Sequence, residues 1–260
     1  MQLVTLLSDF GERDGFVGVM KGVIAQVNEH VKVIDLTHQI PPQNIAAGRF
    51  SLINAYDYFP EGTVHVCVVD PGVGSKRRAI AVEFVGGFLV GPDNGLLSGV
   101  LSKSPAITAV ELTNSEYWRT PQPSSTFHGR DIFASVGAHL ASGVNIKQLG
   151  LEINPASLVK LDLPECRLTE SGLSGCVQHI DYFGNLVTNI LGSYVKGKNW
   201  QILAANLNIP GCETYSEVQI GDAIALVASN GWVEIAVNSG NAQLQLQINL
   251  GDVLEVEFLC

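Results

Sequence analysis

The stretch that decides the fold is CVVDPGVGSKRRAIAV, residues 67–82. An apolar run stops at DP (70–71), the chain turns through GVG (72–74), and a second apolar run follows three cations. A buried strand that ends on a carboxylate is typical of a parallel sheet, where ligand-binding side chains gather beyond the carboxyl ends of the strands. Because side chains alternate along a strand, Arg77 and Arg78 point to opposite faces, so at least one of them can face inward.

Strands and helices alternate on both sides of this stretch. Apolar residues recur at helical spacing from Phe16 to Val27, GRDIFASVGAHLASG (129–143) predicts a second helix, and Gly86-Gly87 predicts a hairpin turn. Short apolar runs predict buried strands at 3–8, 31–36, 63–69 and 107–113. The fold class we expect is therefore α/β, with a mostly parallel sheet in the N-terminal domain.

The pattern changes after about residue 160. Short, often alternating segments follow one another without a strong helix between them, separated by Gly, Asn and Ser. This pattern predicts a C-terminal antiparallel β domain, a barrel or a sandwich. We place the N-terminal α/β domain at 1–155, a linker at about 156–167 and the β domain at 168–260.

Composition excludes several classes of protein. The 260 residues are 46% hydrophobic, enough for a sizeable core, and the net charge of −10 argues against nucleic acid and anionic membranes as partners. No apolar run approaches the roughly 20 residues needed to span a bilayer, and the first residues lack a basic secretory region. Five cysteines without a CxxC pair favour reduced thiols, hence a cytoplasmic location, over disulfides or zinc.

Four polar clusters interrupt otherwise apolar or Gly-rich sequence: SDFG with Asp14, DPGVG with Arg77, SSTFHGRD (124–131) and DYFGN (181–185). The GxG of the second cluster is followed by a strand, whereas a phosphate-binding loop needs a helix start there. An ordinary turn with a solvated Lys76-Arg77-Arg78 run is the simplest alternative. No pair has metal-ligand spacing, no GxSxG marks a serine nucleophile, and Cys67 lies within a strand.

His128 has the strongest context of the six histidines. It follows Ser-Ser-Thr-Phe and immediately precedes a predicted helix. The other histidines have weaker contexts, and His65 fits an ordinary sheet position; they are His30, His38, His65, His139 and His179.

Taken together, the motifs resemble the S-adenosylmethionine hydrolases that form adenosine, which are relatives of fluorinases and chlorinases. The resemblance rests on SDFG, VVDPGVGSKRRAIAV, GPDNGLL, STFHGRDIFA, IDYFGNLVTNI and NSGNA, in the family's order over almost the whole chain. It implies an N-terminal α/β domain, a C-terminal β domain and a homotrimer whose site lies at the subunit interface. It also implies that water attacks C5′ of the ribose and expels methionine, with no metal or other cofactor.

The resemblance assigns the family's water-binding triad to Asp70, Arg77 and His128. Arg77 lies seven residues after Asp70, the family's spacing, so we choose it over Arg78 and leave Lys76 and Arg78 as a solvated pair. Arg77 would favour hydroxide by its charge, while Asp70 and His128 would hold the water and accept its proton. Which of the two accepts the proton stays open at this point.

The same resemblance implies the substrate contacts. Asp9 would bind the ribose hydroxyls, Phe183 would pack on the adenine, and Asn185 would read its polar edge. The remaining implied substrate-binding residues are Asp14, Asp181, Ser229, Asn241 and Ala242, of which Asp181 and Ser229 would hold the ammonium and carboxylate of the methionine. The turn and strand-start sequences at 181–185 and 241–242 also have ordinary structural explanations.

Two positions depart from the family pattern. Phe16 stands where hydrolase relatives usually have Tyr, and Asn230 stands where fluorinases have an Arg for the carboxylate. Fluorinases have Tyr where this chain has Asp70, and an inserted loop where the stretch between GPDNG and STFHG is short. Hydrolysis is therefore the expected reaction; the alternatives are a halide-using adenosyltransferase and a non-catalytic binding protein.

Overall fold

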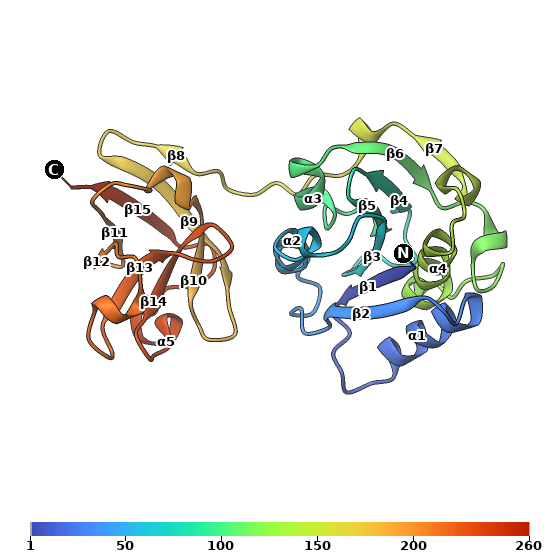
Figure 1. The fold of residues 1–260 in the computed structure, drawn as a ribbon, viewed down its shortest axis with the longest axis horizontal. Helices are drawn as coiled ribbons and strands as arrows, with labels where there is room; N and C mark the ends of the chain where they lie inside the picture. The colour runs from blue at the N-terminus through green and yellow to red at the C-terminus, as the bar shows by residue number, and fades with distance from the viewer. Residues whose placement is uncertain (1, 260) are drawn as a thin grey trace. The chain divides into compact units, whose positions relative to one another are not determined.

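The computed structural model describes residues 2–259, which divide into two compact units: unit 1 extends to Leu161, and unit 2 begins at Asp162. Figure 1 shows the two units as separate bodies of helices and strands. Unit 1 contains two hydrophobic cores, and unit 2 has a main core of its own. The division lies within the linker that the sequence predicts at about 156–167.

Unit 1 is built around a seven-stranded sheet with the order β2-β1-β3-β5-β4-β6-β7. Three pairings are parallel (β1–β2, β1–β3, β3–β5) and three are antiparallel (β4–β5, β4–β6, β6–β7). The strands are β1 Leu3–Ser8, β2 Lys32–Thr37, β3 Thr63–Val68, β4 Ala79–Phe84, β5 Gly87–Pro92, β6 Ala106–Glu111 and β7 Leu151–Ile153.

Helices cover both faces of this sheet. α1 (Phe16–Val27) and α4 (Ala134–Ala141) share one core with the sheet, whereas α2 (Ile45–Ile53) and α3 (Ser98–Lys103) share a second core on the other face (Figure 1). β1 and β3 are buried along their whole length because both of their faces are covered, and four of the six residues in each strand are apolar. A short π-helical turn, Gly129–Phe133, leads into α4.

Unit 2 is an antiparallel sheet with the order β12-β11-β15-β9-β10-β14-β13, and β8 is added beside β9. A bridge between Gly211 and Ala225 links its two ends, which nearly closes the sheet into a barrel. A short helix, α5 (Ala242–Leu246), packs beside it. The strands are β8 Arg167–Leu168, β9 Gly172–Ile180, β10 Leu186–Leu191, β11 Trp200–Ala204, β12 Leu207–Pro210, β13 Ala223–Val227, β14 Trp232–Val237 and β15 Val253–Phe258.

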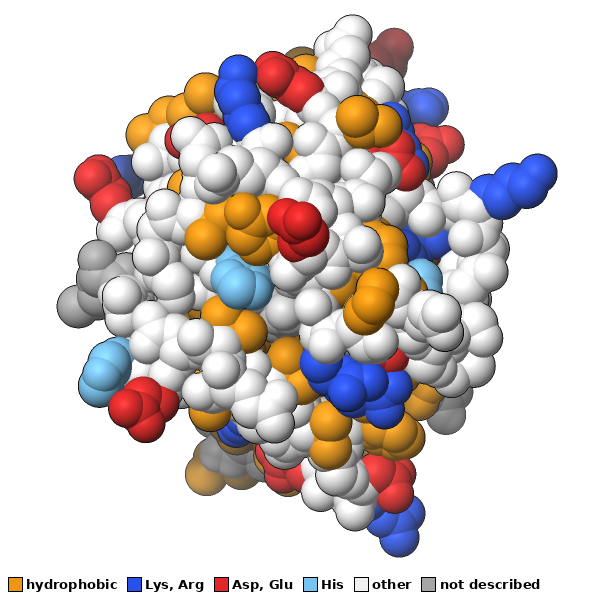
Figure 2. Space-filling model, turned by 90° about the vertical axis from the view of Figure 1, so that its right-hand side faces the viewer, with side chains coloured by type: hydrophobic (Ala, Val, Ile, Leu, Met, Phe, Trp, Pro, Cys, Tyr) orange, Lys and Arg blue, Asp and Glu red, His pale blue; other side chains and the backbone are white. Residues whose placement is uncertain are grey.

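The fold class expected from the sequence is confirmed: an α/β unit precedes an antiparallel, barrel-like one. The sheet of unit 1 is half parallel rather than mostly parallel, because the β4–β5 hairpin and the strands β6 and β7 pair antiparallel. The Gly86-Gly87 hairpin joins β4 to β5, and the predicted helix at 129–143 corresponds to the π-helical turn followed by α4. Within residues 2–259 no helix is long and apolar enough to cross a membrane. Figure 2 shows charged side chains of both signs scattered over one face of the molecule, without one large basic area.

Candidate active site

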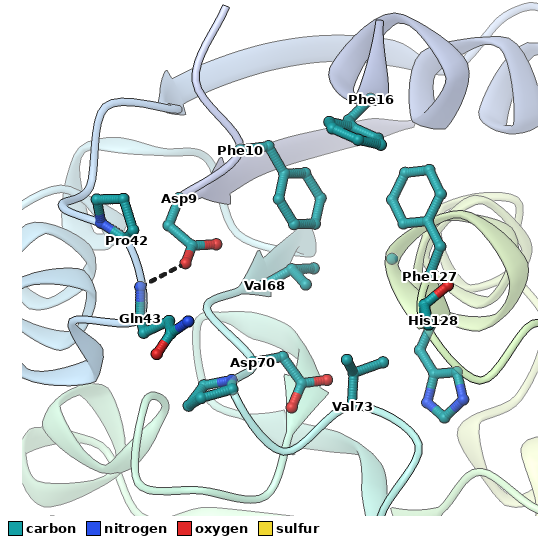
Figure 3. A pocket seen from close by; sticks show the side chains of 13 residues that line it. Asp9, Phe10, Phe16, Pro42, Gln43, Val68, Asp70, Val73, Phe127 and His128 are labelled. Carbon is teal, nitrogen blue, oxygen red and sulfur yellow. Dashed lines mark hydrogen bonds between the residues drawn. The ribbon is translucent and has the colours of Figure 1, made fainter. Parts of the chain in front are cut away.

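A pocket of about 390 Å³ opens in unit 1 at the carboxyl ends of β1 and β3. Asp9 follows β1, and Asp70 lies two residues beyond β3, as expected for ligand sites in a parallel sheet. His128 reaches the same pocket from the loop before the π-helical turn (Figure 3). Three of the residues implied by the sequence thus line one pocket, although together they span more than a hundred positions of the chain.

Asp70, Arg77 and His128 form one connected group. Arg77 Nε donates to both carboxylate oxygens of Asp70, at 2.9 and 3.0 Å, and its Nη2 also bonds Asp70. The same Nη2 lies 2.8 Å from His128 Nδ1. The side chains of Asp70 and Arg77 are only 5% and 10% exposed, so this ion pair is shielded from solvent and its geometry is fixed.

These contacts define the protonation state of His128. Arg77 has only N–H donors, so Nδ1 must accept the hydrogen bond and the neutral imidazole must carry its proton on Nε2. Burial lowers the pKa of His128 and the charge of Arg77 lowers it further, while Asp70 and Asp131 act in the opposite direction without reversing the shift. The neutral ring therefore persists below the pH at which an ordinary histidine becomes charged.

A close approach of two loops brings the triad together. Gly74, at φ +77°, packs so tightly that an added Cβ would lie 2.3 Å from the carbonyl oxygen of Ser125. The loop that carries Asp70 and Arg77 therefore lies directly against the loop that carries His128. The glycine of the GVG turn serves this contact rather than a phosphate cradle.

Arg78 departs from the expectation of a solvated pair with Lys76. Its Nε donates to Asp93 at 2.9 Å, and its Nη1 donates to Ser157 Oγ at 3.0 Å. Both arginines come just before β4, where the chain is already extended and Asp93 N donates to the carbonyl of Arg78. Consecutive side chains of an extended chain point to opposite sides, so Arg77 turns to Asp70 and Arg78 turns to the buried carboxylate of Asp93. Lys76 is exposed, as expected.

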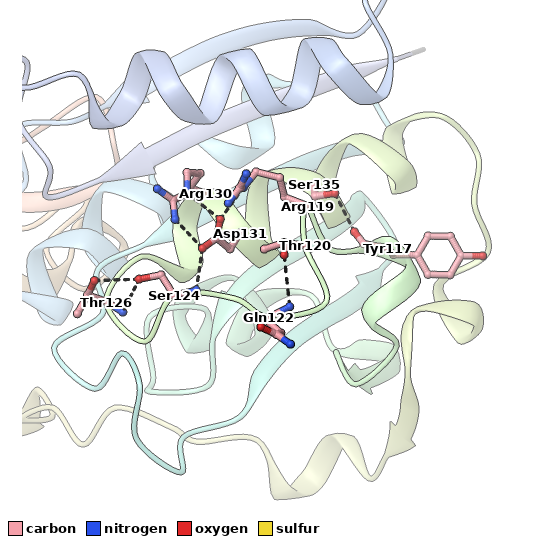
Figure 4. A network of polar contacts seen from close by, with 9 residues as sticks. All are labelled: Tyr117, Arg119, Thr120, Gln122, Ser124, Thr126, Arg130, Asp131 and Ser135. Carbon is pink, nitrogen blue, oxygen red and sulfur yellow. Dashed lines mark hydrogen bonds and ion pairs between the residues drawn. The ribbon is translucent and has the colours of Figure 1, made fainter.

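The His128 loop is itself anchored by a fully buried carboxylate, Asp131 (Figure 4). Its oxygens accept hydrogen bonds from Arg119 Nε, from Arg130 Nε and Nη2, and from Ser124 N. Burial alone would raise the pKa of Asp131, but these hydrogen bonds outweigh it and hold the pKa well below its usual range. Asp131 thereby fixes the loop on both sides of His128.

Asp9 is held by the backbone of a neighbouring loop. The N–H of Gln43 donates to Asp9 Oδ2 at 2.7 Å, which leaves Oδ1 for a ligand (Figure 3). Gln43 has a left-handed backbone, φ +64°, which aims this N–H at the carboxylate. Sequence reasoning missed Gln43, because a main-chain donor leaves no trace in the residue type.

Three phenylalanines form the apolar wall of the pocket. The rings of Phe10, Phe16 and Phe127 lie 5.3–5.9 Å apart in tilted or edge-to-face arrangements. Asp14 is exposed in the loop before α1 and does not line this pocket. The structure therefore does not bring Asp14 to the other implied site residues of unit 1.

A second group of implied residues meets in unit 2, at the turn between β9 and β10. Asp181 Oδ1 accepts from the N–H groups of Phe183 and Asn185, and Oδ2 accepts from Asn185 Nδ2. Gly184 lies so close to Asn241 that an added Cβ would clash with the Asn241 side chain. The carbonyl of Gly184 accepts a hydrogen bond from Gln243 N. The Phe183 side chain projects from this turn and is 72% exposed.

The 181–185 turn and the start of α5 therefore form one surface. Asn241 caps α5 with its side chain, and Ala242 is buried behind it. An exposed aromatic ring beside backbone and amide groups is a suitable platform for a flat, polar-edged ligand. The Asp181 carboxylate is already engaged by its own turn, which is the ordinary structural explanation of the motif.

Ser229 lies elsewhere in unit 2. It is in the turn between β13 and β14, two residues before Gly231, whose carbonyl accepts from the N–H of Gly192 just after β10. Asp181 lies before β10, so the two residues are at opposite ends of a six-residue strand, about 20 Å long at 3.3 Å per residue. Within unit 2, Asp181 and Ser229 do not converge on one small group.

The cysteines and possible metal ligands of the described residues offer no further reactive site. Cys67, Cys166, Cys176 and Cys212 are free thiols, and Cys260 lies outside the described residues. Burial raises the pKa of the Cys67 thiol above its ordinary value, which makes it unreactive. No group of three or more His, Cys, Asp or Glu among residues 2–259 is arranged to hold a metal ion.

Comparison with known proteins places this geometry in a family. Residues 4–150 match the SAM hydroxide adenosyltransferase N-terminal domain, and residues 175–255 match the corresponding C-terminal domain. The chain belongs to the SAM hydroxide adenosyltransferase family. The family resemblance inferred from the sequence motifs is thereby confirmed.

Individual relatives agree with this assignment. The (R)-S-adenosyl-L-methionine hydrolase of Salinispora tropica is 39% identical over 254 residues, which cover 97% of each chain. A fluorinase of Actinopolyspora mzabensis is more distant, 27% identical with 98% of this chain and 96% of its own covered. A crystal structure of an uncharacterized conserved protein from Thermotoga maritima, 32% identical, superposes with a TM-score of 0.91 over 97% of this chain and 99% of its own.

Proposed function

We propose that this protein hydrolyses S-adenosyl-L-methionine to adenosine and L-methionine. Family membership and the similarity to named hydrolases at 36–39% identity support the reaction. The observation that carries the proposal is the shielded Asp70–Arg77–His128 group, two of whose members, Asp70 and His128, line one pocket with Asp9, where a water and a ribose can meet.

In the proposed reaction, water oxygen forms a bond to C5′ while the C5′–S bond breaks. The bonding electron pair goes to sulfur, which becomes a neutral thioether, so the leaving group needs no acid. Water is a weak nucleophile, so it must be held in line with the C5′–S bond and must lose a proton. Positioning contributes several kcal/mol to such steps, and a placed base contributes about 10²–10⁴-fold.

The hydrogen bonds of the triad favour Asp70 as the proton acceptor. Neutral His128 already carries its proton on Nε2, so that nitrogen can only donate, and Nδ1 is engaged by Arg77. Asp70 shares its oxygens with Arg77 but is an acceptor only, with lone pairs left for a water. Accordingly His128 holds the water oxygen, Asp70 takes the proton, and Arg77 keeps both side chains in place.

We further propose that the substrate needs both half-sites. Unit 1 supplies the reacting groups and Asp9 for the ribose, and unit 2 supplies Phe183 and Asn185 for the adenine, with Asn241 and Ala242 beside them. A homotrimer, with the site formed where unit 1 of one subunit meets unit 2 of another, is the assembly implied by the family resemblance. Light scattering of the purified protein at a range of concentrations tests that assembly.

The role of Asp181 and Ser229 in holding the methionine remains part of this proposal, with a geometric condition. Because they lie at opposite ends of β10, they can hold one amino-acid group only through an extended ligand or through different subunits.

We assign no ligand contact to Asp14. The proposal includes no metal or other cofactor, no nucleic-acid or membrane partner, and a cytoplasmic location, which the four free thiols support.

The experiment that tests the reaction is product analysis of the pure protein with S-adenosyl-L-methionine in H₂¹⁸O. Hydrolysis at C5′ yields adenosine with ¹⁸O in its 5′-hydroxyl, together with methionine. A halogenated nucleoside in the presence of halide would indicate a halide-using transferase instead, a reaction that the negative charge of Asp70 disfavours. Unchanged substrate that stays bound would indicate a binding protein.

A further inference from the structure

A buried chain of polar side chains lies directly beside Asp9. Ser8 ends β1 and His38 follows β2, and the parallel register of the two strands, Leu7 opposite Thr37, puts them side by side. Ser8 Oγ lies 2.7 Å from His38 Nδ1. Both side chains are inaccessible to solvent, at 0% and 3% exposure, so this contact is a fixed part of the fold.

The direction of these hydrogen bonds follows from their partners. Ser8 Oγ accepts from the N–H of Phe10 at 3.3 Å, so its own hydrogen is free to point at His38 Nδ1. His38 Nε2 lies 3.1 Å from Asp35 Oδ1, and this acceptor-only carboxylate favours the imidazole proton on Nε2, so Nδ1 accepts from the Ser8 hydroxyl. The contact of Nε2 with Asp35 is close but poorly aligned as a hydrogen bond, so its contribution is electrostatic.

The outer end of the chain is an exposed ion pair. Lys21 Nζ lies 2.6 Å from Asp35 Oδ2. Burial acts to raise the pKa of Asp35, but the interactions with Lys21 and His38 outweigh it and lower the pKa. Asp35 therefore remains a carboxylate and holds the ring of His38 in one orientation.

A Ser–His–Asp sequence of contacts is the arrangement of many hydrolases, but here it cannot supply a nucleophile. Ser8 Oγ is fully buried, and neither Ser8 nor His38 lines the pocket. A nucleophilic hydroxyl must reach a substrate atom. Any effect of this chain on the reaction must therefore pass through a neighbouring residue.

That neighbour is Asp9. Ser8 precedes it, the Ser8 hydroxyl holds Phe10 N, and the carbonyl of His38 accepts from Gly11 N at 2.8 Å. The segment that begins at His38 continues to Gln43, whose N–H holds Asp9 Oδ2. The loop that carries Asp9 is thus tied to the His38 segment before, at and after the carboxylate.

We propose that His38 is a positioning residue that, through Ser8, orients the Asp9 carboxylate for the ribose hydroxyls. The proposal rests on the proposed function, since it assumes that Asp9 binds the ribose. The pair is distinct from the Asp70–Arg77–His128 group, with which it shares no hydrogen bond among the described residues. Its loss should therefore weaken ribose recognition specifically.

The chain provides a matched control on the same strand. Thr5 Oγ1 lies 2.8 Å from His65 Nδ1, both side chains are buried, and the pair packs against Phe59 and Phe84 rather than the pocket. Thr5→Val and Ser8→Ala each remove one buried hydroxyl from β1 that bonds a histidine. Only the second change touches the segment that holds Asp9.

The test is titration calorimetry of the full-length protein with adenosine and with 2′,3′-dideoxyadenosine. In the unchanged protein, adenosine should bind tighter by roughly ten- to a hundredfold, and Asp9→Asn should abolish that preference. Ser8→Ala should reduce the preference about fivefold or more while leaving dideoxyadenosine affinity within about twofold. Thr5→Val should preserve the preference even where it lowers the melting temperature.

A second pair of variants guards against misfolding. His38→Asn keeps an acceptor near the Nδ1 position and should retain most of the preference, whereas His38→Leu should lose it. If the unchanged protein does not distinguish the two nucleosides, the role of Asp9 and the proposed function are wrong. If Asp9→Asn abolishes the preference but Ser8→Ala behaves like Thr5→Val, the positioning role of His38 alone is wrong.

Discussion

The two half-sites of the molecule differ in how their polar groups are satisfied. In unit 1, Asp70, Arg77 and His128 hold one another in a shielded cluster that spans two loops. In unit 2, the Asp181 carboxylate accepts hydrogen bonds from its own turn, and the Phe183 side chain is exposed. The groups proposed for chemistry are thus fixed in advance by the fold, whereas those proposed for adenine binding present a surface that a ligand must cover.

This contrast has an energetic basis. Fixed donors and acceptors aimed at a reacting atom need no reorganisation during the reaction, which is where enzymes gain most of their rate. An exposed aromatic ring contributes binding energy when a ligand buries it, and it costs little stability beforehand. Changes in unit 1 should therefore affect turnover, and changes at the unit 2 turn should affect affinity.

The largest expected effect comes from Asp70→Asn. The amide preserves the shape but removes the charge and the proton acceptor, so kcat should fall about 10²–10⁴-fold with substrate affinity nearly unchanged. Single-turnover rates and equilibrium binding of S-adenosyl-L-methionine measure the two quantities separately. Weaker binding with unchanged turnover would contradict the role of the triad.

Gly74→Ala should have the next largest effect. The new methyl would meet the Ser125 carbonyl at 2.3 Å, so the Asp70 and His128 loops must separate. We expect kcat to fall roughly tenfold or more, because displacements of about 1 Å can cost up to 10²-fold. Gly62→Ala is the matched control, since Gly62 also has a positive φ but has no atom within 4 Å of the added methyl. Equal losses of kcat in both variants would show that backbone strain, not loop contact, matters.

Phe183→Ala should change binding rather than turnover. Loss of stacking on a base costs about 1–3 kcal/mol, so KM should rise roughly five- to a hundredfold while the melting temperature stays constant. Tyr182→Ala is the control, because Tyr182 lies next to Phe183, is 99% exposed and has no assigned ligand contact. A KM that rises equally in both variants would remove Phe183 from the adenine site.

The smallest expected effect is a shift of the pH at which activity is lost on the acidic side of the kcat/KM profile. Protonation of His128 at Nδ1 would break its bond to Arg77, so activity should fall as the ring becomes charged. Burial and Arg77 lower the pKa of His128 below its ordinary 6.5, so the protein should stay active through that value and lose activity only at lower pH. The pH dependence of kcat/KM measures this loss, and a midpoint at or above 6.5 would contradict the assignment.

Much of this organisation can be predicted from the residues. The apolar runs at β1 and β3 indicate buried strands, and the carboxylates that follow these strands mark the edge of the pocket. The pairing of Arg77 with Asp70 follows from seven-residue spacing in a family motif together with strand alternation. These features are local, or repeat a pattern that the family shares.

What sequence reasoning missed depends on contacts between distant segments. The hydrogen bond from Gln43 N to Asp9 depends on the left-handed backbone of Gln43. The contact between Gly74 and Ser125 joins two loops about fifty residues apart. Arg78 pairs with Asp93, on the side opposite Arg77. His38 has an ordinary sequence context because its partner Ser8 becomes a neighbour only through parallel strand register. Residue types alone carry no record of such three-dimensional neighbours.

The central claim is that Asp70 and His128 hold the attacking water. Its most direct test is a crystal structure of the slow Asp70→Asn variant with S-adenosyl-L-methionine bound. We predict an ordered water within hydrogen-bond distance of His128 Nε2 and the side chain at position 70, opposite sulfur and in line with the C5′–S bond. A ligand whose C5′ faces away from this group, or whose sulfur occupies the predicted water position, would contradict the account.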